Sequence, residues 1–155
     1  MAGKIDARLK ELGIELPSAN APAANYVPYV RSGNLLFVSG QTCKNASGMI
    51  YSGRVGAERT PEEGVKAARI CALNLISQVK EACEGNLDRV RRVVKLTVFV
   101  QSVDGFHAQP LIGNGASDVI ADIFGDAGRH ARAAVGCNAL PGGTTVEVEG
   151  VFEIE

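Results

Sequence analysis

Three segments of the chain carry apolar residues at three- and four-residue steps, the spacing that places them on one face of an α-helix. The longest begins at Thr60, which forms a capping box with Glu63 around a proline at the first helical position. Another is stopped by Gly125, and Asn114 or Ser117 is its expected cap. The predicted helices cover residues 5–12, 60–84 and 116–124.

Stretches rich in β-branched and aromatic residues predict the strands. Gly33-Asn34 is a turn dipeptide between two of these stretches, so we expect a hairpin. Its second half, LLFVSGQ, is apolar until Ser39, which indicates burial on both faces and a polar end where chemistry could occur. The expected strands cover residues 29–32, 35–39 and 90–100, with two more within residues 130–155.

Two segments are expected to lack regular structure. Residues 16–28 hold three prolines among small residues and should run extended over the surface. Residues 106–115 include Pro110, Gly113 and Gly115, which predict an irregular loop before the last helix.

The order of these elements predicts an α+β fold. We expect a two-layer sandwich in which two major helices cover one face of a mixed sheet, with a short N-terminal helix added. A chain of 155 residues fits one domain, residues 1–155, around one core. In the last strand Glu147, Val151 and Glu153 share the face turned away from the helices, because side chains alternate along a strand. An apolar residue on that face predicts that a second copy of the chain covers part of it.

Composition narrows the function classes. Hydrophobic residues make up 46% of the chain and charged residues 21%, with a net charge of −1, which is typical of a globular protein. A nucleic-acid partner is not favoured, because the only basic run is Arg89, Arg91, Arg92 and Lys95. The sequence shows neither a signal peptide nor an apolar stretch of membrane-spanning length, so we expect a cytoplasmic protein without a membrane partner.

The four cysteines do not follow a metal-binding or disulfide spacing. Cys43, Cys71, Cys83 and Cys137 lie far apart, and neither histidine is close to them in sequence. We therefore predict buried free thiols and no metal site. His130 either contacts a ligand or caps the turn before its strand.

Arg132 and Glu147 are the strongest candidates for chemistry. A guanidinium grips a carboxylate at two points, and a carboxylate can orient or activate water. Two interpretations remain open at this stage. The two side chains form either a structural ion pair or part of a binding site near a subunit boundary.

The chain resembles the YjgF-type, or Rid (reactive intermediate imine deaminase, RidA-like), family, also known as endoribonuclease L-PSP. The resemblance runs from about residue 20 onward and is carried by APAANYVPYV at 21–30, LLFVSGQ at 35–41 and VVKLTVFV at 93–100. Its most specific part is HARAAV at 130–135 followed by LPGGTTVEVE at 140–149. This resemblance implies a chorismate-mutase-like fold and a homotrimer with clefts between subunits.

The resemblance also implies an activity. Active members hydrolyse small enamine or imine intermediates such as 2-aminoacrylate to 2-keto acids and ammonia, and they need no cofactor. By motif, Arg132 would bind the substrate carboxylate and Glu147 would position water. Tyr29, Ser39 and Asn114 would line the cleft.

The sequence departs from the better-known deaminases at two places. Ala134 stands where many of them have a cysteine, and its backbone would hold a water instead. Residues 106–118 form a longer segment than its counterpart in those enzymes. These departures motivate one alternative, a trimer that binds small metabolite carboxylates without turnover. The second family label suggests another, an RNA-cleaving translation inhibitor.

Overall fold

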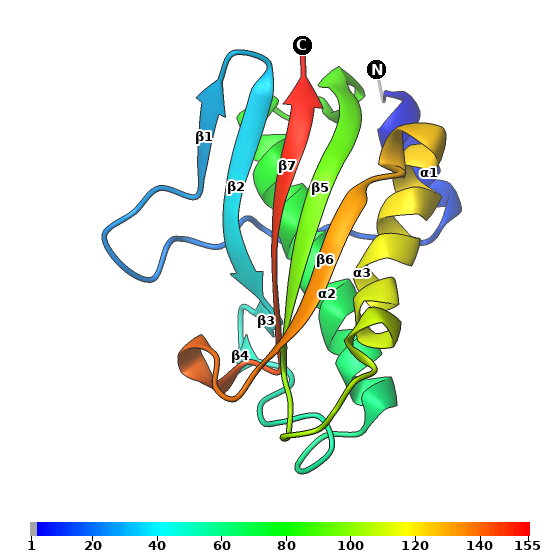
Figure 1. Ribbon diagram of the computed structural model, residues 1–155. Coiled ribbons are helices and arrows are strands. Elements are labelled where there is room, and N and C mark those ends of the chain that lie inside the picture. The colour runs from blue at the N-terminus through cyan, green and yellow to red at the C-terminus, as the bar shows by residue number, and fades with distance from the viewer. Residues whose placement is uncertain (1–2) are drawn as a thin grey trace.

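A mixed sheet of five strands forms one layer of the structure, and the long helices α2 and α3 lie together on one of its faces (Figure 1). The computed structural model describes residues 3–155. Its helices are α1 (Lys4–Glu11), α2 (Pro61–Ala82) and α3 (Gln109–Phe124), with 3-10 turns η1 (Leu87–Arg89), η2 (Gly125–Gly128) and η3 (Pro141–Gly143). Its strands are β1 (Tyr29–Ser32), β2 (Leu35–Thr42), β3 (Lys44–Asn45), β4 (Gly48–Met49), β5 (Val90–Gln101), β6 (Ala131–Cys137) and β7 (Val146–Ile154). The predicted α+β sandwich is confirmed.

The strands of the main sheet follow the order β1-β2-β7-β5-β6. All neighbours are antiparallel except β5 and β6, which are parallel and are joined by a crossover through α3. β1 and β6 are therefore the two edge strands. The short pair β3 and β4 forms a separate two-stranded ribbon.

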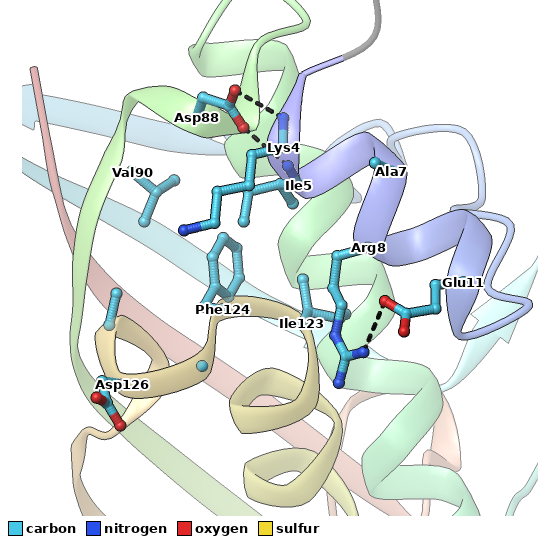
Figure 2. Close-up of a pocket in the computed structure, with 12 residues that line it drawn as sticks. Lys4, Ile5, Ala7, Arg8, Glu11, Asp88, Val90, Ile123, Phe124 and Asp126 are labelled. Carbon is cyan, nitrogen blue, oxygen red and sulfur yellow. Dashed lines mark hydrogen bonds and ion pairs between the residues drawn. The ribbon is translucent and has the colours of Figure 1, made fainter.

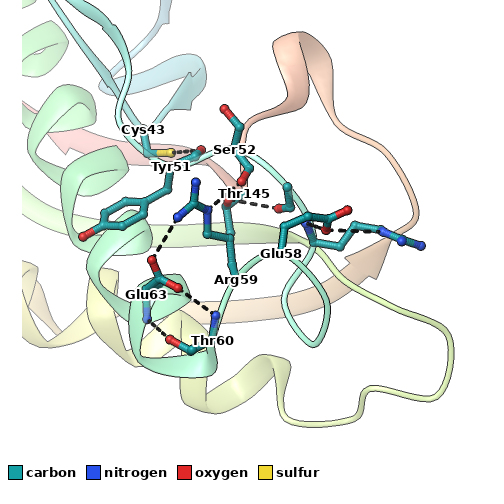
Figure 3. Close-up of polar contacts among 10 residues, drawn as sticks. Cys43, Tyr51, Ser52, Glu58, Arg59, Thr60, Glu63 and Thr145 are labelled. Carbon is teal, nitrogen blue, oxygen red and sulfur yellow. Dashed lines mark hydrogen bonds and ion pairs between the residues drawn. The ribbon is translucent and has the colours of Figure 1, made fainter.

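The capping box predicted at the start of α2 is present. Thr60 Oγ1 accepts a hydrogen bond from the amide of Glu63 at 3.2 Å, and Glu63 Oε1 accepts one from the amide of Thr60 at 3.0 Å. Figure 3 shows that Arg59 reaches the same carboxylate, and its Nε also donates to the carbonyl of Ser52 at 2.7 Å. The helix start is thereby tied to the loop that precedes it.

α3 begins earlier than the sequence pattern predicts. It starts at Gln109, so the expected loop over residues 106–115 is wrong beyond its first three residues. Pro110 is tolerated because it lies in the first turn, where the helix needs no amide donor. Asn114 and Ser117 lie inside the helix, and its N-cap is Ala108, which makes no side-chain cap. The predicted cap was therefore also wrong.

Helices α2 and α3 pack closely because one glycine lacks a side chain. A Cβ atom on Gly115 would lie 2.1 Å from the carbonyl oxygen of Val65 in α2. Such a distance is impossible for real atoms, so the glycine inside α3 is required by the contact between the two helices.

The sheet face turned away from α2 and α3, called the open face below, is only partly polar. Along β2, Leu36 and Val38 are buried under the helices, whereas Leu35 and Phe37 are exposed. The prediction that this strand is buried on both faces is wrong for the single chain, because only one face carries helices. Phe37 remains 46% exposed in the middle of the open face.

The short N-terminal helix is capped by a residue far away in the sequence. The amides of Lys4 and Ile5 each donate to the Asp88 carboxylate at 2.9 Å, as the dashed lines in Figure 2 show. The amide of Ile5, and then that of Lys4, lowers the pKa of Asp88, because both hydrogen bonds favour the ionised form. Leu9 packs into the core, so α1 is held at both its polar start and its apolar side.

Candidate functional site

Arg132 lies on the edge strand β6 and is held by the neighbouring helix α3. Its Nη1 donates to Asn114 Oδ1 and to Ser117 Oγ, both at 3.0 Å. Its Nη2 donates to the carbonyl of Pro110 at 3.1 Å. Three acceptors on successive turns of α3 therefore fix the plane of the guanidinium.

Gly113 provides the space in which this guanidinium lies. A Cβ atom at Gly113 would be 3.0 Å from Arg132 Nη1 and 3.1 Å from its Cζ. The guanidinium thus packs flat against the backbone of α3. This contact explains why a glycine is found inside a helix, where it is normally unfavourable.

The contacts with α3 leave part of the guanidinium free. Arginine has five N–H donors, and among residues 3–155 only three of them find acceptors on α3. The Nε–H and one Nη2–H remain. These two nitrogens share one edge of the plane, and a carboxylate can accept from both of them.

Glu147 lies on β7 in a different environment. Its carboxylate packs against the backbone of Gly40, where a Cβ atom would approach Glu147 Oε2 to 2.0 Å. Among residues 3–155 it has no hydrogen-bond or ion-pair partner. Burial, and then the neighbouring charge of Glu149, raises the pKa of Glu147. A carboxyl group with a raised pKa can accept and donate a proton at a pH closer to neutral than an ordinary glutamate can.

Glu147 lines a cavity of about 230 Å³ between the sheet and the proline-rich connector. The cavity is bounded by Asn20, Ala21, Pro22, Ala23, Tyr26, Pro28, Gly40, Gln41, Thr42, Lys44, Met49, Pro141, Gly142 and Glu147. Connector residues from Asn20 to Pro28 form one wall. No sequence pattern indicates this wall, because an irregular segment has no periodicity that shows which side chains face inward.

Arg132 and Glu147 project from opposite faces of the sheet. Arg132 pairs with Leu96 of β5, and Glu147 pairs with Phe99 of the same strand. Leu96 and Phe99 are three residues apart, so their side chains leave opposite faces. No ion pair among residues 3–155 joins Arg132 to Glu147. The interpretation of a structural Arg–Glu pair within one chain was therefore wrong.

The other predicted site residues are divided between these two regions. Asn114 contacts Arg132 directly. Ala134, two residues further along β6, faces the helices and packs against the core. Ser39 Oγ donates to the carbonyl of Val27 at 2.8 Å, beside the cavity but not among its lining residues. Tyr29 also lies outside the cavity lining and packs against the core from β1.

The sequence pattern indicated Ser117 only as a possible cap and indicated no role for Gly113. Both lie on the α3 surface that holds Arg132. The available signal was the spacing of Pro110, Gly113 and Ser117, which repeats at three to four residues and matches one side of a helix. It was missed because proline and glycine were interpreted as helix breakers.

Two arginines of the basic run at residues 89–95 have acidic neighbours. Arg89 lies 3.8 Å from Glu84, and Arg91 lies 2.9 Å from the side chain of Glu155. Most of the cysteines are buried free thiols, as predicted, but Cys137 is only partly buried. In residues 3–155 no helix has the length and apolar character needed to cross a membrane.

The two-layer fold, with an arginine on its edge strand and a half-buried carboxylate on its open face, defines an α+β protein of the chorismate-mutase-like class. The family described as "YjgF/chorismate mutase-like, putative endoribonuclease" matches residues 6–149. The chain belongs to this family, as the sequence motifs predicted.

Relatives are similar over nearly the whole chain. Protein TCP17 of Trypanosoma cruzi is 53% identical over 99% of this chain and 96% of its own length. The crystal structure of Atu1372, a protein of unknown function from Agrobacterium tumefaciens, is 48% identical with a TM-score of 0.91, covering 97% of this chain and 92% of that one. A 2-iminobutanoate/2-iminopropanoate deaminase of Dermatophagoides farinae is 28% identical over 92% of this chain and 95% of its own length.

Proposed function

We propose that this protein is a hydrolytic deaminase of small imines or enamines that carry a carboxylate. The observation that carries the proposal is the Arg132 guanidinium, which is fixed by three acceptors on α3 while its Nε–H and one Nη2–H have no acceptor there. The relative from Dermatophagoides farinae, named as an iminobutanoate and iminopropanoate deaminase, supports the reaction class.

The proposed site lies between two copies of the chain in a homotrimer. Arg132 and Glu147 project from opposite faces of one sheet, so one chain alone cannot bring them to the same small molecule. Arg132 lies on an edge strand, where a neighbouring copy can approach. We therefore place Arg132 of one copy opposite the Glu147 cavity of the next, with the open faces packed together.

In this site the substrate carboxylate accepts hydrogen bonds from Arg132, and the imine carbon lies near Glu147. Glu147 removes a proton from water as the oxygen attacks that carbon. It then returns the proton to nitrogen, which gives a carbinolamine. The same carboxylate next carries the hydroxyl proton to nitrogen as the C–N bond breaks and the C=O bond forms, so that ammonia and a 2-keto acid leave. An imine carbon is already electrophilic, so orienting the substrate and one water supplies most of what catalysis needs, without a cofactor.

The residues give less support to cleavage of RNA. A phosphate track needs several free basic side chains, whereas two of the four in this short run, Arg89 and Arg91, have acidic neighbours. Binding of a small carboxylate without turnover remains the second candidate, favoured by Ala134 at the position where a thiol is found in many deaminases.

The test is hydrolysis of 2-aminoacrylate generated in place, followed by release of ammonia and keto acid. Arg132→Ala should lower kcat/KM about 100-fold or more, because two charge-assisted hydrogen bonds to the substrate are lost. Arg129→Ala is the matched control, because this arginine lies three residues earlier and its side chain is 82% exposed. Equal activity of folded wild type and Arg132→Ala would reject the proposal. Saturable keto-acid binding without hydrolysis would select the second candidate.

A further inference from the structure

A chain of hydrogen bonds runs from Arg132 to the turn before β6. Arg132 Nη1 lies 3.0 Å from Ser117 Oγ, and Ser117 Oγ lies 2.9 Å from His130 Nε2. The other ring nitrogen, His130 Nδ1, lies 2.7 Å from the carbonyl oxygen of Gly128. The histidine and the serine are partly buried.

The chemistry of these groups determines the direction of each bond. A carbonyl oxygen only accepts, so His130 Nδ1 carries the hydrogen that Gly128 receives. In a neutral ring Nε2 is then an acceptor, and the Ser117 hydroxyl donates to it. The serine oxygen is left to accept from Arg132, which can only donate.

We propose that His130 and Ser117 are positioning residues for Arg132: the histidine fixes the direction of the serine hydroxyl, and the serine oxygen then fixes the guanidinium. The consequence for function rests on the proposed role of Arg132 in binding a carboxylate. Arginine has many rotamers, and restricting them before a ligand arrives reduces the entropy lost on binding. Asn114 and Pro110 supply the other two acceptors, so loss of the serine bond loosens the guanidinium but does not release it.

A simpler role for His130 is to cap the turn through Gly128 alone. Two variants of similar size separate these roles. The amide nitrogen of asparagine in His130→Asn corresponds to Nδ1, so this variant keeps the bond to Gly128 and loses the acceptor for Ser117. The side-chain oxygen of glutamine in His130→Gln reaches the place of Nε2, so this variant keeps the acceptor and loses the bond to Gly128.

The first measurement is steady-state imine hydrolysis by His130→Asn, His130→Gln and Ser117→Ala. His130→Asn and Ser117→Ala should raise KM roughly five- to tenfold, the effect of one lost hydrogen bond, with kcat within about twofold of wild type. His130→Gln should stay near wild type. A turn-capping role would give the reverse order, with His130→Gln impaired and His130→Asn unaffected, and would overturn the proposal.

The second measurement does not depend on turnover. ¹⁵N NMR of the folded wild-type protein near neutral pH should show His130 as the Nδ1–H tautomer, and Ser117→Ala should speed rotation of the Arg132 Nη groups. The Nε2–H tautomer, or unchanged Arg132 rotation in Ser117→Ala, would overturn the positioning chain. If wild type neither hydrolyses imines nor binds keto acids, the proposed function fails, while this spectroscopic result still decides whether His130 and Ser117 hold Arg132.

Discussion

At the scale of single residues, Arg132 and Glu147 differ in how the protein stabilises their charges. Three of the guanidinium N–H groups of Arg132 donate hydrogen bonds to α3, so the charge of the arginine is stabilised before a ligand binds. Glu147 has no such partner among residues 3–155, and burial disfavours its ionised form. An unsupported carboxylate on a folded protein reduces stability, and its presence here is explained if it acts on a substrate or water.

The raised pKa of Glu147 predicts how its removal affects both stability and activity. Between the usual pKa of a glutamate and the raised value, the folded chain binds more protons than the unfolded chain, so the free energy of unfolding falls as pH rises through that interval. Glu147→Gln should therefore be more stable than wild type at about pH 7.5, with the difference vanishing at about pH 4. It should also lower kcat about 100-fold, the scale of general acid–base catalysis. Denaturant unfolding at both pH values and steady-state kinetics measure these effects.

Glu149→Gln is the control for this prediction. Glu149 is exposed and has no role in the proposed reaction, so its substitution should change kcat little. Its charge helps to raise the pKa of Glu147, so its removal should move the acidic limb of the kcat/KM profile to lower pH. A Glu147→Gln protein that is less stable than wild type at neutral pH would contradict the description of this carboxylate.

At the scale of elements, α3 and β6 act as one unit. The crossover that makes β6 parallel to β5 also brings the first turns of α3 beside Arg132. Two glycines of α3 serve different contacts within this unit. Gly113 lies under the guanidinium, whereas Gly115 lies against the α2 backbone at Val65.

Substituting each of these glycines should separate ligand binding from stability. Gly113→Ala favours the helix by up to about 1 kcal/mol, so stability should not fall, but its methyl group displaces Arg132. We expect kcat/KM to drop roughly tenfold or more, because small displacements of a binding group are costly. Gly115→Ala should instead destabilise the fold by about 1–3 kcal/mol, because α2 and α3 are forced apart. Thermal unfolding and kinetics of the two variants test this; a Gly113→Ala enzyme of normal activity would contradict it.

At the scale of the whole molecule, the open face is the face of the sheet that α2 and α3 leave uncovered. Val30, Phe37, Val151 and Lys95 lie in one cross-strand row over β1, β2, β7 and β5. Val30 is 53% and Phe37 46% exposed in the single chain, so the middle of the face remains apolar. Such a surface favours assembly with further copies.

Mixing two inactive variants tests whether the proposed site is shared between copies. Arg132→Ala and Glu147→Gln homotrimers should each be nearly inactive. In a cyclic trimer with both variants, one boundary joins an intact Arg132 to an intact Glu147. Equal random mixing makes three quarters of the trimers mixed, with one active site in three, so activity should recover to about one quarter of wild type.

Co-expression with two different affinity tags, followed by purification on both, isolates the mixed trimers, which should show about one third of wild-type activity. Mixing after separate purification under conditions that prevent exchange is the control and should recover nothing. No recovery in proven mixed trimers would show that both residues act within one copy, and a purely monomeric protein in sedimentation would reject the trimer itself.

The sequence by itself determined the features that depend on neighbouring residues. The capping box at Thr60, the apolar stripe of α2 and the alternation along β7 all follow from local geometry, and each was found where predicted. The family could also be recognised, because its motifs around Arg132 and Glu147 are contiguous.

Only the tertiary structure decided how distant segments meet. The start of α3 was missed because Gly113 and Gly115 break a helical pattern in sequence, while in the fold they fit Arg132 and α2. The placement of Arg132 and Glu147 on opposite faces depends on the register of β6 and β7 against β5. No local pattern encodes that register, because it results from burying the helices and the sheet against each other.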